Sequence, residues 1–142
     1  GDLDGNTSSG DYDMFLVKYN SSGTKQWTKQ LGTSELDYGL GVTTDSSNNI
    51  YVTGRTDGDL DGNTSSGSQD IFLVKYNSSG TKQWTKQLGT SGYDFGLGVT
   101  TDSSDNIYVT GNTNGYGGLD GNTHLGYTDI FLVKYDSSGT KQ

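Results

Sequence analysis

The middle of the chain reads Asp70-Ile-Phe-Leu-Val-Lys-Tyr-Asn-Ser-Ser-Gly-Thr-Lys-Gln-Trp-Thr-Lys-Gln-Leu88, and much of the fold can be inferred from this stretch. Residues 70–76 and 81–88 are short runs that contain β-branched and aromatic side chains. They flank Asn77-Ser-Ser-Gly80, whose residue types favour tight turns. The stretch therefore predicts two antiparallel strands joined as a hairpin.

A second predicted hairpin follows in the same unit. It comprises Leu97-Gly-Val-Thr-Thr101 and Ile107-Tyr-Val-Thr-Gly111, joined by Asp102-Ser-Ser-Asp-Asn106. This connector also consists of residues that tolerate turns. Each unit therefore contains four predicted strands.

The unit recurs along the chain. Residues 58–114 align with residues 1–57 without a gap, and 48 of the 57 positions are identical. A third, partial copy covers residues 115–142 and carries a two-residue insertion, so that Leu119 corresponds to Leu60. Because repeats of this length form arrays in which neighbouring units share a core, we predict one repeat array over residues 1–142.

Bulky side chains alternate onto both faces of the predicted strands. Phe72, Val74 and Tyr76 share one face of their strand, whereas Leu73 lies on the other. A sheet with one face in water would not show this pattern, so we expect four-stranded sheets stacked face to face. Four strands per repeat are typical of all-β propeller blades. A linear β-solenoid stack of the same sheets satisfies the pattern as well and is the alternative.

The chain resembles the bacterial SBBP β-propeller repeat family in residues 70–76 and in Trp84-Thr-Lys-Gln-Leu-Gly-Thr-Ser-Gly-Tyr-Asp-Phe-Gly-Leu-Gly-Val-Thr-Thr-Asp-Ser-Ser-Asp-Asn-Ile-Tyr-Val-Thr-Gly111. The likeness covers essentially the whole chain. It implies blades whose innermost strand carries Leu97 and Val99, followed outward by the Ile107, Phe131 and Lys-Gln segments. It also implies a secreted or surface-exposed bacterial protein of a kind that generally has no assigned catalytic activity.

The composition excludes several classes of protein. Gly, Thr, Ser, Asp and Asn supply 85 of the 142 residues, whereas Ala, Pro and Cys are absent. A helical protein would need more of the good helix formers. Without Cys there is neither a disulfide scaffold nor a thiolate nucleophile. No apolar run approaches the roughly 18–20 residues that span a bilayer, so we predict no membrane insertion.

The charge and the incomplete array indicate which partners to expect. A net charge of −8 argues against nucleic acid, because phosphate binding requires a basic face.

Two and a half blades cannot close a ring, which takes at least about four. Unpaired strand edges would otherwise be exposed, so we expect assembly with further blades or with copies of the chain itself.

Each repeat carries an acidic loop that is a candidate calcium site. In the second repeat it runs from Asp59 to Asp70, with carboxylate or amide oxygens at loop positions 1, 3, 5 and 12. Oxygens at alternate positions of a tight loop are suitable calcium ligands. The candidate ligands in the three copies are Asp2, Asp4, Asn6, Asp13, Asp59, Asp61, Asn63, Asp70, Asp120, Asn122 and Asp129.

The acidic loop has a second interpretation. Asp-Gly and Gly-Asn are good turn residues, and Asp and Asn side chains bind their own backbone. The match to EF-hand loops is partial, since Gly stands at position 4 and Asp rather than Glu at position 12. Gly118 replaces the first Asp of the third copy, where binding should be weaker. Calcium binding and turn formation both stay open at this point.

No catalytic constellation is recognisable, and we predict that the protein is not an enzyme. His124 is the only imidazole and stands in the divergent loop of one copy. Neither a nucleophile elbow nor a His-containing metal motif occurs. Asp59 and Asp61 are paired acids, but their repetition favours a structural role over acid–base catalysis.

Aromatic residues suggest a binding function instead. Trp27 and Trp84 lie in the middle of predicted strands, and Tyr38 and Phe95 precede the predicted inner strands. Such rings either stack on sugars or fill gaps between blades, and we favour packing. We therefore predict a non-enzymatic structural or interaction module outside the cell, with calcium as its one candidate cofactor. The alternative is a lectin-like propeller that binds a glycan or a protein at its loop ends or central channel.

Overall fold

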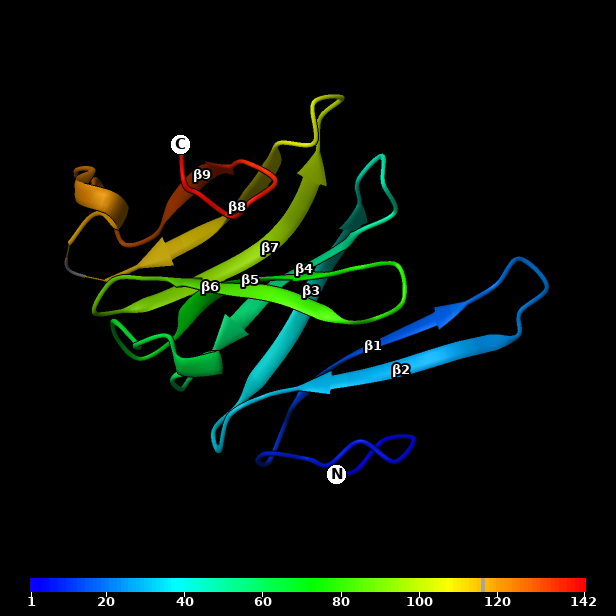
Figure 1. Cartoon of the computed structure of the whole chain (residues 1–142). Coiled ribbons are helices and arrows are strands. Elements are labelled where there is room, and N and C mark those ends of the chain that lie inside the picture. Colours follow the sequence, from blue (N-terminus) through cyan, green and yellow to red (C-terminus); the bar gives the residue numbers. More distant parts are fainter. Residues whose placement is uncertain (116) are drawn as a thin grey trace.

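The computed structural model describes residues 1–115 and 117–142, which form three antiparallel sheets (Figure 1). Tyr116, in the predicted third repeat, lies outside the described residues. The first sheet contains β1 (Met14–Tyr19) and β2 (Lys25–Leu31); the second contains β3 (Asp37–Thr44), β4 (Ile50–Thr56), β5 (Asp70–Tyr76) and β6 (Lys82–Leu88); the third contains β7 (Tyr93–Thr101), β8 (Ile107–Asn114) and β9 (Asp129–Tyr135). Two 3-10 turns, η1 (Leu60–Gly62) and η2 (Leu119–Gly121), precede β5 and β9. Over the described residues, neither turn approaches the length or apolarity of a membrane-spanning helix.

Consecutive strands are neighbours in every sheet. The second sheet has the order β3-β4-β5-β6 and the third has the order β7-β8-β9. In the second sheet β3, the equivalent of the strand that contains Leu97, therefore lies at one edge, and β6, which begins with Lys82-Gln83, lies at the other edge. This is the order that the family resemblance implies. The predicted all-β fold of antiparallel propeller blades is confirmed, and the described sheets form an open series rather than a closed ring.

The strand β7 is longer than the sequence predicts. It begins at Tyr93 rather than Leu97, because Tyr93 already pairs with Asn114 at the end of β8. The register shifts between Gly96 and Gly98, and β3 shows the same shift. Glycines and a bulge interrupt the period-2 pattern, which explains why the pattern marks the strand start too late.

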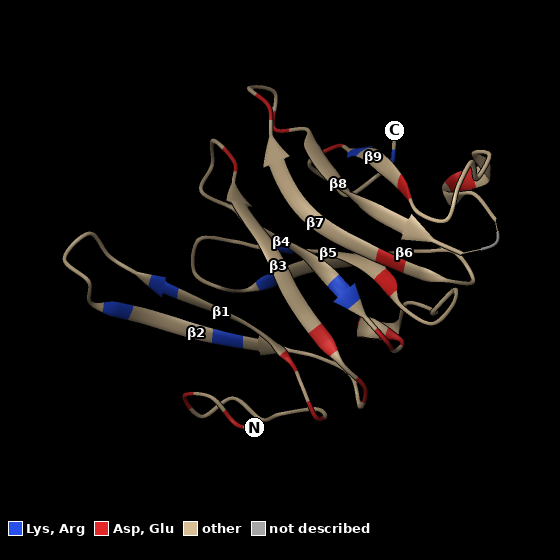
Figure 2. Cartoon of the chain, turned by 180° about the vertical axis from the view of Figure 1, so that it is seen from behind, with Lys and Arg blue, Asp and Glu red and all other residues tan. Residues whose placement is uncertain are grey.

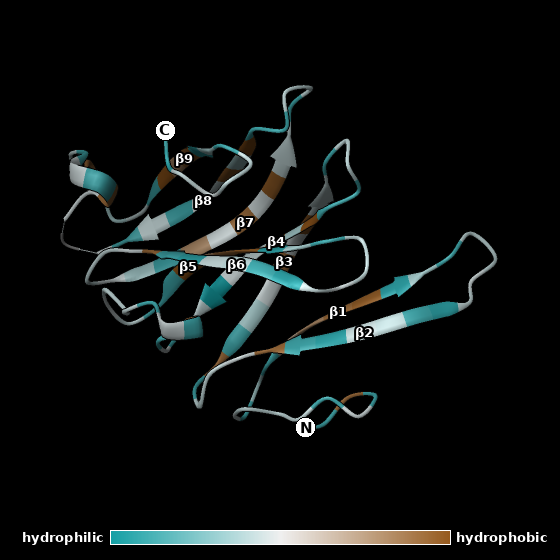
Figure 3. Ribbon diagram, viewed as in Figure 1, coloured by the Kyte–Doolittle hydropathy of each residue, from teal (hydrophilic) through white to brown (hydrophobic). Residues whose placement is uncertain are grey.

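The sheets pack face to face, and β5 is buried on both faces. Figure 3 shows that apolar residues concentrate in the strands, whereas the loops are mostly hydrophilic. The cluster between the first and second sheets comprises Met14, Ile50, Val52, Leu60, Phe72, Val74 and Tyr76; the cluster between the second and third comprises Tyr51, Ile71, Leu73, Ile107, Val109, Leu119, Val133 and Tyr135. Burial of these side chains holds neighbouring sheets together. The prediction of strands with two buried faces is therefore confirmed.

The two ends of the sheets carry different connections (Figure 1). At one end short turns join the hairpins, and Asn77 Oδ1 accepts hydrogen bonds there from the N–H groups of Ser79 (3.1 Å) and Thr81 (2.9 Å). At the other end lie the segments 1–13, 32–36, 57–69, 89–92 and the described part of 115–128. We call this end the loop rim.

Candidate functional site

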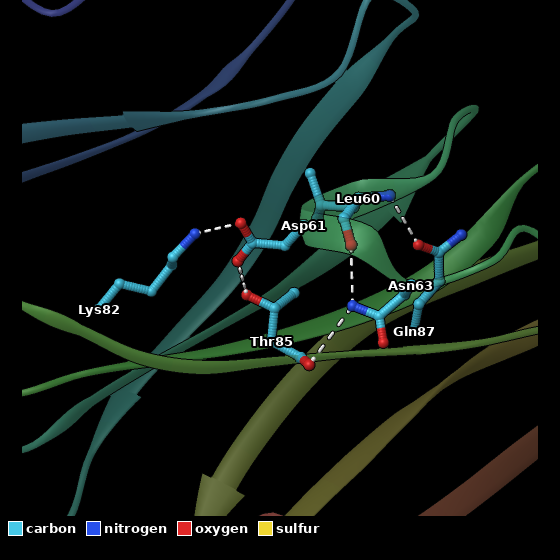
Figure 4. Close-up of polar contacts among 6 residues, drawn as sticks. All are labelled: Leu60, Asp61, Asn63, Lys82, Thr85 and Gln87. Carbon is cyan, nitrogen blue, oxygen red and sulfur yellow. Dashed lines mark hydrogen bonds and ion pairs between the residues drawn. The ribbon is translucent and has the colours of Figure 1, made fainter.

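The acidic loop of the second repeat lies against β6 and makes several polar contacts with it (Figure 4). Its Leu60 is fully buried in the cluster between the first and second sheets. The N–H of Leu60 donates to Gln87 Oε1 on β6 (3.0 Å), and Asn63 Nδ2 donates to the Leu60 carbonyl (2.8 Å). The loop thus places one apolar side chain in the core while its polar groups bind the neighbouring strand.

Asp61 and Asn63 hold the loop against β6. Asp61 accepts a hydrogen bond from Thr85 Oγ1 (2.6 Å) and forms an ion pair with Lys82. Burial raises the pKa of the Asp61 carboxyl, but the hydrogen bonds from Lys82 and Thr85 outweigh burial and keep the pKa below its ordinary value. Asn63 Nδ2 also reaches the Thr85 carbonyl at 3.4 Å.

Asp59 and Asp70 bind backbone N–H groups within the same loop. Asp59 Oδ1 accepts from Ser65 (2.7 Å), and Asp70 Oδ2 accepts from Ser66 (2.7 Å). Asp70 Oδ2 also accepts from Gln87 Nε2 at 3.0 Å. These are contacts of the kind that the turn interpretation predicts.

The other two copies make related contacts. In the first copy they are Asp2 Oδ1 with Ser8 N (2.8 Å), Asp4 Oδ2 with Thr28 Oγ1 (2.5 Å) and Lys25 Nζ (2.6 Å), Asn6 Nδ2 with Leu3 O (2.9 Å), and Asp13 Oδ2 with Ser9 N (2.8 Å). In the third copy they are Asp120 with Lys141, Asn122 Nδ2 with Leu119 O (2.8 Å), and Asp129 Oδ2 with Leu125 N (2.8 Å). His124 lies in this third loop with its Nδ1 3.0 Å from Asp129 Oδ2.

These contacts direct the candidate calcium ligands toward different protein groups. Within residues 1–115 and 117–142, no three or more His, Cys, Asp or Glu side chains are grouped to hold a metal ion. An ion bound to Asp61 would have to displace Lys82 and Thr85 or share the carboxylate with them. Calcium binding stays a prediction that a titration must test.

Both tryptophans pack between sheets. Trp27 contacts the cluster between the first and second sheets, and Trp84 contacts the next cluster, where its ring centroid lies 6.0 Å from that of Tyr51. A Cβ on Gly80, in the β5–β6 turn, would lie 3.0 Å from the Trp27 indole. The tryptophans therefore fill gaps between blades, as the packing interpretation expects.

The near-identical repeats differ mainly at the loop rim. Nine positions distinguish residues 1–57 from residues 58–114. Seven of them lie in the rim or in the strand ends beside it: Asp11/Ser68, Tyr12/Gln69, Glu35/Gly92, Leu36/Tyr93, Tyr38/Phe95, Arg55/Asn112 and Asp57/Asn114. Three acids of the first copy are thus neutral in the second. In repeat proteins the variable loops of one face often form the binding face.

The rim differences bring together an aromatic–arginine cluster of Tyr12, Tyr38, Arg55 and Phe95. The Tyr12 and Tyr38 rings stack with centroids 5.7 Å apart. The Arg55 guanidinium lies 4.4 Å from the Tyr38 ring centroid and 5.2 Å from that of Phe95, and it donates to Gln69. Such cation–π contacts hold the rings in fixed positions.

Sequence reasoning treated Tyr38 and Phe95 as gap-filling residues and did not connect them with Arg55. The signal that identifies them is the distribution of differences between the copies. The only Arg of the chain stands where the next repeat has Asn112. Tyr38 and Arg55 pair across β3 and β4 of one sheet, but Phe95 comes from β7 of the next sheet, so the whole cluster becomes visible only when the sheets are stacked.

Stacked antiparallel sheets, with loop leucines packed between them, define a repeat protein of the β-propeller type. The sequence matches the β-propeller repeat family SBBP at residues 26–61 and 83–118. The chain belongs to this family.

Two longer proteins are similar to the chain. An uncharacterized WD repeat-containing protein of Acanthamoeba polyphaga mimivirus is 33% identical over 122 residues, which cover 74% of the chain and 9% of that protein. The regulatory protein FlaEY of Caulobacter vibrioides is 27% identical over 150 residues, which cover 99% of the chain and 16% of that protein. The chain thus corresponds to a small part of each relative.

Proposed function

We propose that the chain is a non-enzymatic structural and interaction module of a secreted or cell-surface protein, assembling with further blades or further copies of itself. The observation that carries this proposal is the bare face of the third sheet. Ile130 and Leu132 on β9 are 90% and 70% exposed, whereas the equivalent Ile71 and Leu73 of β5 are 4% and 2% exposed. The latter lie in the cluster shared with the next sheet. Exposed apolar patches of this kind mark interaction surfaces.

Light scattering on the 15.2 kDa chain tests the proposal. We expect a discrete oligomer or a filament whose fraction rises with protein concentration, because subunits cover one another's apolar faces. A folded monomer at every concentration would contradict assembly. An unfolded or aggregating chain would mean that further blades are required for stability.

The surface charge supports protein or glycan partners rather than nucleic acid. Acidic residues lie mainly in loops and at strand ends, and Lys and Arg lie mainly along the strands (Figure 2). The net charge of −8 would repel a phosphate backbone. An extracellular location agrees with this hydrated surface and with the family resemblance.

A second candidate function is the binding of a glycan or a protein at the loop rim. The observation that favours it is the aromatic–arginine cluster, which occurs where the repeats differ. Tyr12 is 60% exposed at the end of this cluster and offers a ring to a ligand.

A matched pair of variants tests this second function. Tyr19 is 57% exposed but lies at the opposite end of β1. In titrations with a panel of soluble oligosaccharides and peptides, Tyr12→Ala should abolish saturable binding and Tyr19→Ala should not. Equal effects of the two variants, or no saturable binding by the parent chain, would contradict a rim site.

Calcium binding by the acidic loops is the remaining part of the proposal. The oxygen-rich Asp59–Asp70 loop supports it. We expect a heat of binding on calorimetric titration with millimolar calcium, reduced by Asp61→Asn. Absence of any calcium heat in the parent chain would remove calcium from the proposal.

A further inference from the structure

Arg55 of β4 is held at the loop rim by side chains from two sheets. Its guanidinium lies 4.4 Å from the ring centroid of Tyr38 on β3 and 5.2 Å from that of Phe95 on β7. The guanidinium also donates a hydrogen bond to Oε1 of Gln69, a buried side chain just before β5. The position of the guanidinium at the junction of the second and third sheets is therefore fixed before a ligand binds.

Most N–H donors of Arg55 are left for another group. A guanidinium has five N–H donors, and a cation–π contact with a ring uses none of them. Among the residues that the structure describes, Gln69 is the one hydrogen-bond acceptor of this side chain, and no carboxylate forms an ion pair with it. Arg55 is partly exposed, so a group from solution can reach the remaining donors.

The acid that is connected to Arg55 does not neutralise it. Gln69 Nε2 donates to Asp57 Oδ2 (3.2 Å), so the Gln69 amide binds Arg55 through its oxygen and Asp57 through its nitrogen. Asp57 Oδ1 is buried and accepts no hydrogen bond from any described residue. The amide thus stands between the two charges, and the guanidinium keeps its positive charge without a carboxylate bound to it.

A guanidinium in this state selects a particular ligand group. Its planar fork of donors matches a carboxylate, which it binds with two parallel hydrogen bonds. Two acids lie beside the site, since the N–H of Asp57 donates to the Leu36 carbonyl (3.0 Å) and the exposed Glu35 directly precedes Leu36. Carboxylates accept hydrogen bonds but repel further negative charge. One carboxylate combined with several hydroxyl groups therefore matches the site better than a polyanion does.

The site occurs once, although the repeats are nearly identical. Arg55 comes from the first copy and Gln69 from the second. The equivalent pair one repeat further along the chain is Asn112 and Thr128, which includes no cation. Arg55 is moreover the only Arg of the chain. We therefore expect one ligand per chain.

We propose that Arg55 binds the carboxylate of an acidic sugar, a single uronic acid residue within a glycan. The inference rests on the proposed binding function of the loop rim and names its ligand class. Two N–H groups of Arg55 donate to the two carboxylate oxygens, and the exposed Glu35 carboxylate is available to accept from the sugar hydroxyls. An acidic peptide would bring several negative charges, which the neighbouring acids repel.

Titration with a short oligosaccharide that contains one glucuronic acid residue tests the proposal. The comparison ligand is the same oligosaccharide with its carboxyl group reduced to an alcohol. We expect the acidic form to bind about tenfold or more tightly than the neutral form, because charge-assisted bidentate hydrogen bonds are the strong ones. As Arg55 is the only Arg, its Nε–H gives a single side-chain NMR signal, which should shift with the acidic form alone.

Three variants identify the group that binds the carboxylate. Arg55→Asn introduces the residue that the next repeat carries at position 112, so it should fold, and it should weaken binding of the acidic form about tenfold or more. Arg55→Lys keeps the charge without the bidentate geometry and should restore part of the affinity. The matched control Lys75→Asn removes a cation that also lies over a ring, 5.3 Å from the Tyr51 centroid, at the turn end of β5. It should change the affinity by less than about twofold.

The outcomes separate this inference from the proposed rim function. Equal affinity for the acidic and neutral oligosaccharides, or parental affinity in a folded Arg55→Asn variant, would overturn the carboxylate contact and leave a glycan site at the rim. If Arg55→Asn does not fold, an unshifted Nε–H signal in the parent chain would overturn that contact as well. Binding of an acidic peptide but of neither oligosaccharide would overturn the sugar as the ligand and leave protein binding intact. No saturable binding of any of these ligands would overturn both the inference and the rim function.

Discussion

Leu60 is fully buried, although the other residues between Asp59 and Asn63 are Asp, Gly or Asn. The Leu60 N–H, Asp61 and Asn63 bind β6, and Asp59 binds Ser65 within the loop, so the loop places an apolar side chain between two sheets while these polar groups are hydrogen-bonded. The same arrangement recurs at Leu119, which belongs to the next interblade cluster. At the level of single residues, the acidic loop is therefore a packing element.

This role predicts different costs for equivalent leucines. Leu60→Ala should lower the free energy of unfolding by about 2–5 kcal/mol, because it leaves a cavity between two sheets. The equivalent Leu3 is 37% exposed, and Leu3→Ala should cost roughly 0.5 kcal/mol. Urea denaturation of both variants measures the difference. Equal losses of unfolding free energy in the two variants would contradict the packing role of Leu60.

Asp102 predicts a specific response to acid. The side-chain hydrogen bond from Asn106, together with backbone N–H donors, lowers the pKa of Asp102 to about 2 from its ordinary 3.8. Because the folded state lowers this pKa, the stabilisation is present above about pH 3.8 and disappears as the pH falls toward 2. Asn106→Ala should raise the pKa of the Asp102 carboxyl and reduce this acid sensitivity. An NMR titration in which the carboxyl carbon is unaffected by Asn106→Ala would oppose the assignment.

At the level of elements, the hairpin turns are also packing surfaces. Gly80 has a φ of +79°, and a Cβ there would lie 3.0 Å from the Trp27 ring and 2.8 Å from Cε of Lys29. Gly23 in the equivalent β1–β2 turn has the same φ but no atom within 4 Å of its Cβ position. The β5–β6 turn therefore covers the tryptophan of the blade before it.

Substitution of these two glycines distinguishes the stability lost through backbone strain from the stability lost through crowding of the indole. Both Gly23→Ala and Gly80→Ala should lose about 1–2 kcal/mol of stability through the left-handed backbone. Gly80→Ala should lose about 1–3 kcal/mol more, because it crowds the indole. Thermal unfolding and Trp fluorescence of both variants check this, and the emission should shift only for Gly80→Ala. Identical unfolding midpoints would argue against the turn–tryptophan contact.

The elements themselves were largely predictable from the sequence, and their contacts were not. The alternation at 70–76 and the turn residues at 77–80 identify the β5–β6 hairpin correctly. The start of β7 is missed because Gly96 and Gly98 interrupt the alternation. The burial of Leu60 and the position of Arg55 between Tyr38 and Phe95 depend on the adjacent sheet, which no local pattern specifies.

At the level of the whole molecule, the hydrophobic clusters lie between adjacent blades, so neighbouring blades share them. The second blade combines two strands from residues 1–57 with two from residues 58–114, so a single sequence repeat does not form a complete sheet. Both faces of β5 are covered, whereas the equivalent outward face of β9 is bare. Stability of such an array depends on nearest-neighbour interfaces, and its outermost faces govern association.

The bare face predicts that stability and association can be separated by substitution at equivalent positions. Leu132→Ser should change the free energy of unfolding by no more than about 0.5 kcal/mol, because that side chain is largely exposed. It should nevertheless lower the oligomer fraction seen by light scattering. The matched Leu73→Ser, in the covered face of the second blade, should cost about 3 kcal/mol or more. If Leu132→Ser leaves the oligomer fraction unchanged, the apolar face of β9 is not an assembly surface, and association would have to proceed through strand edges alone.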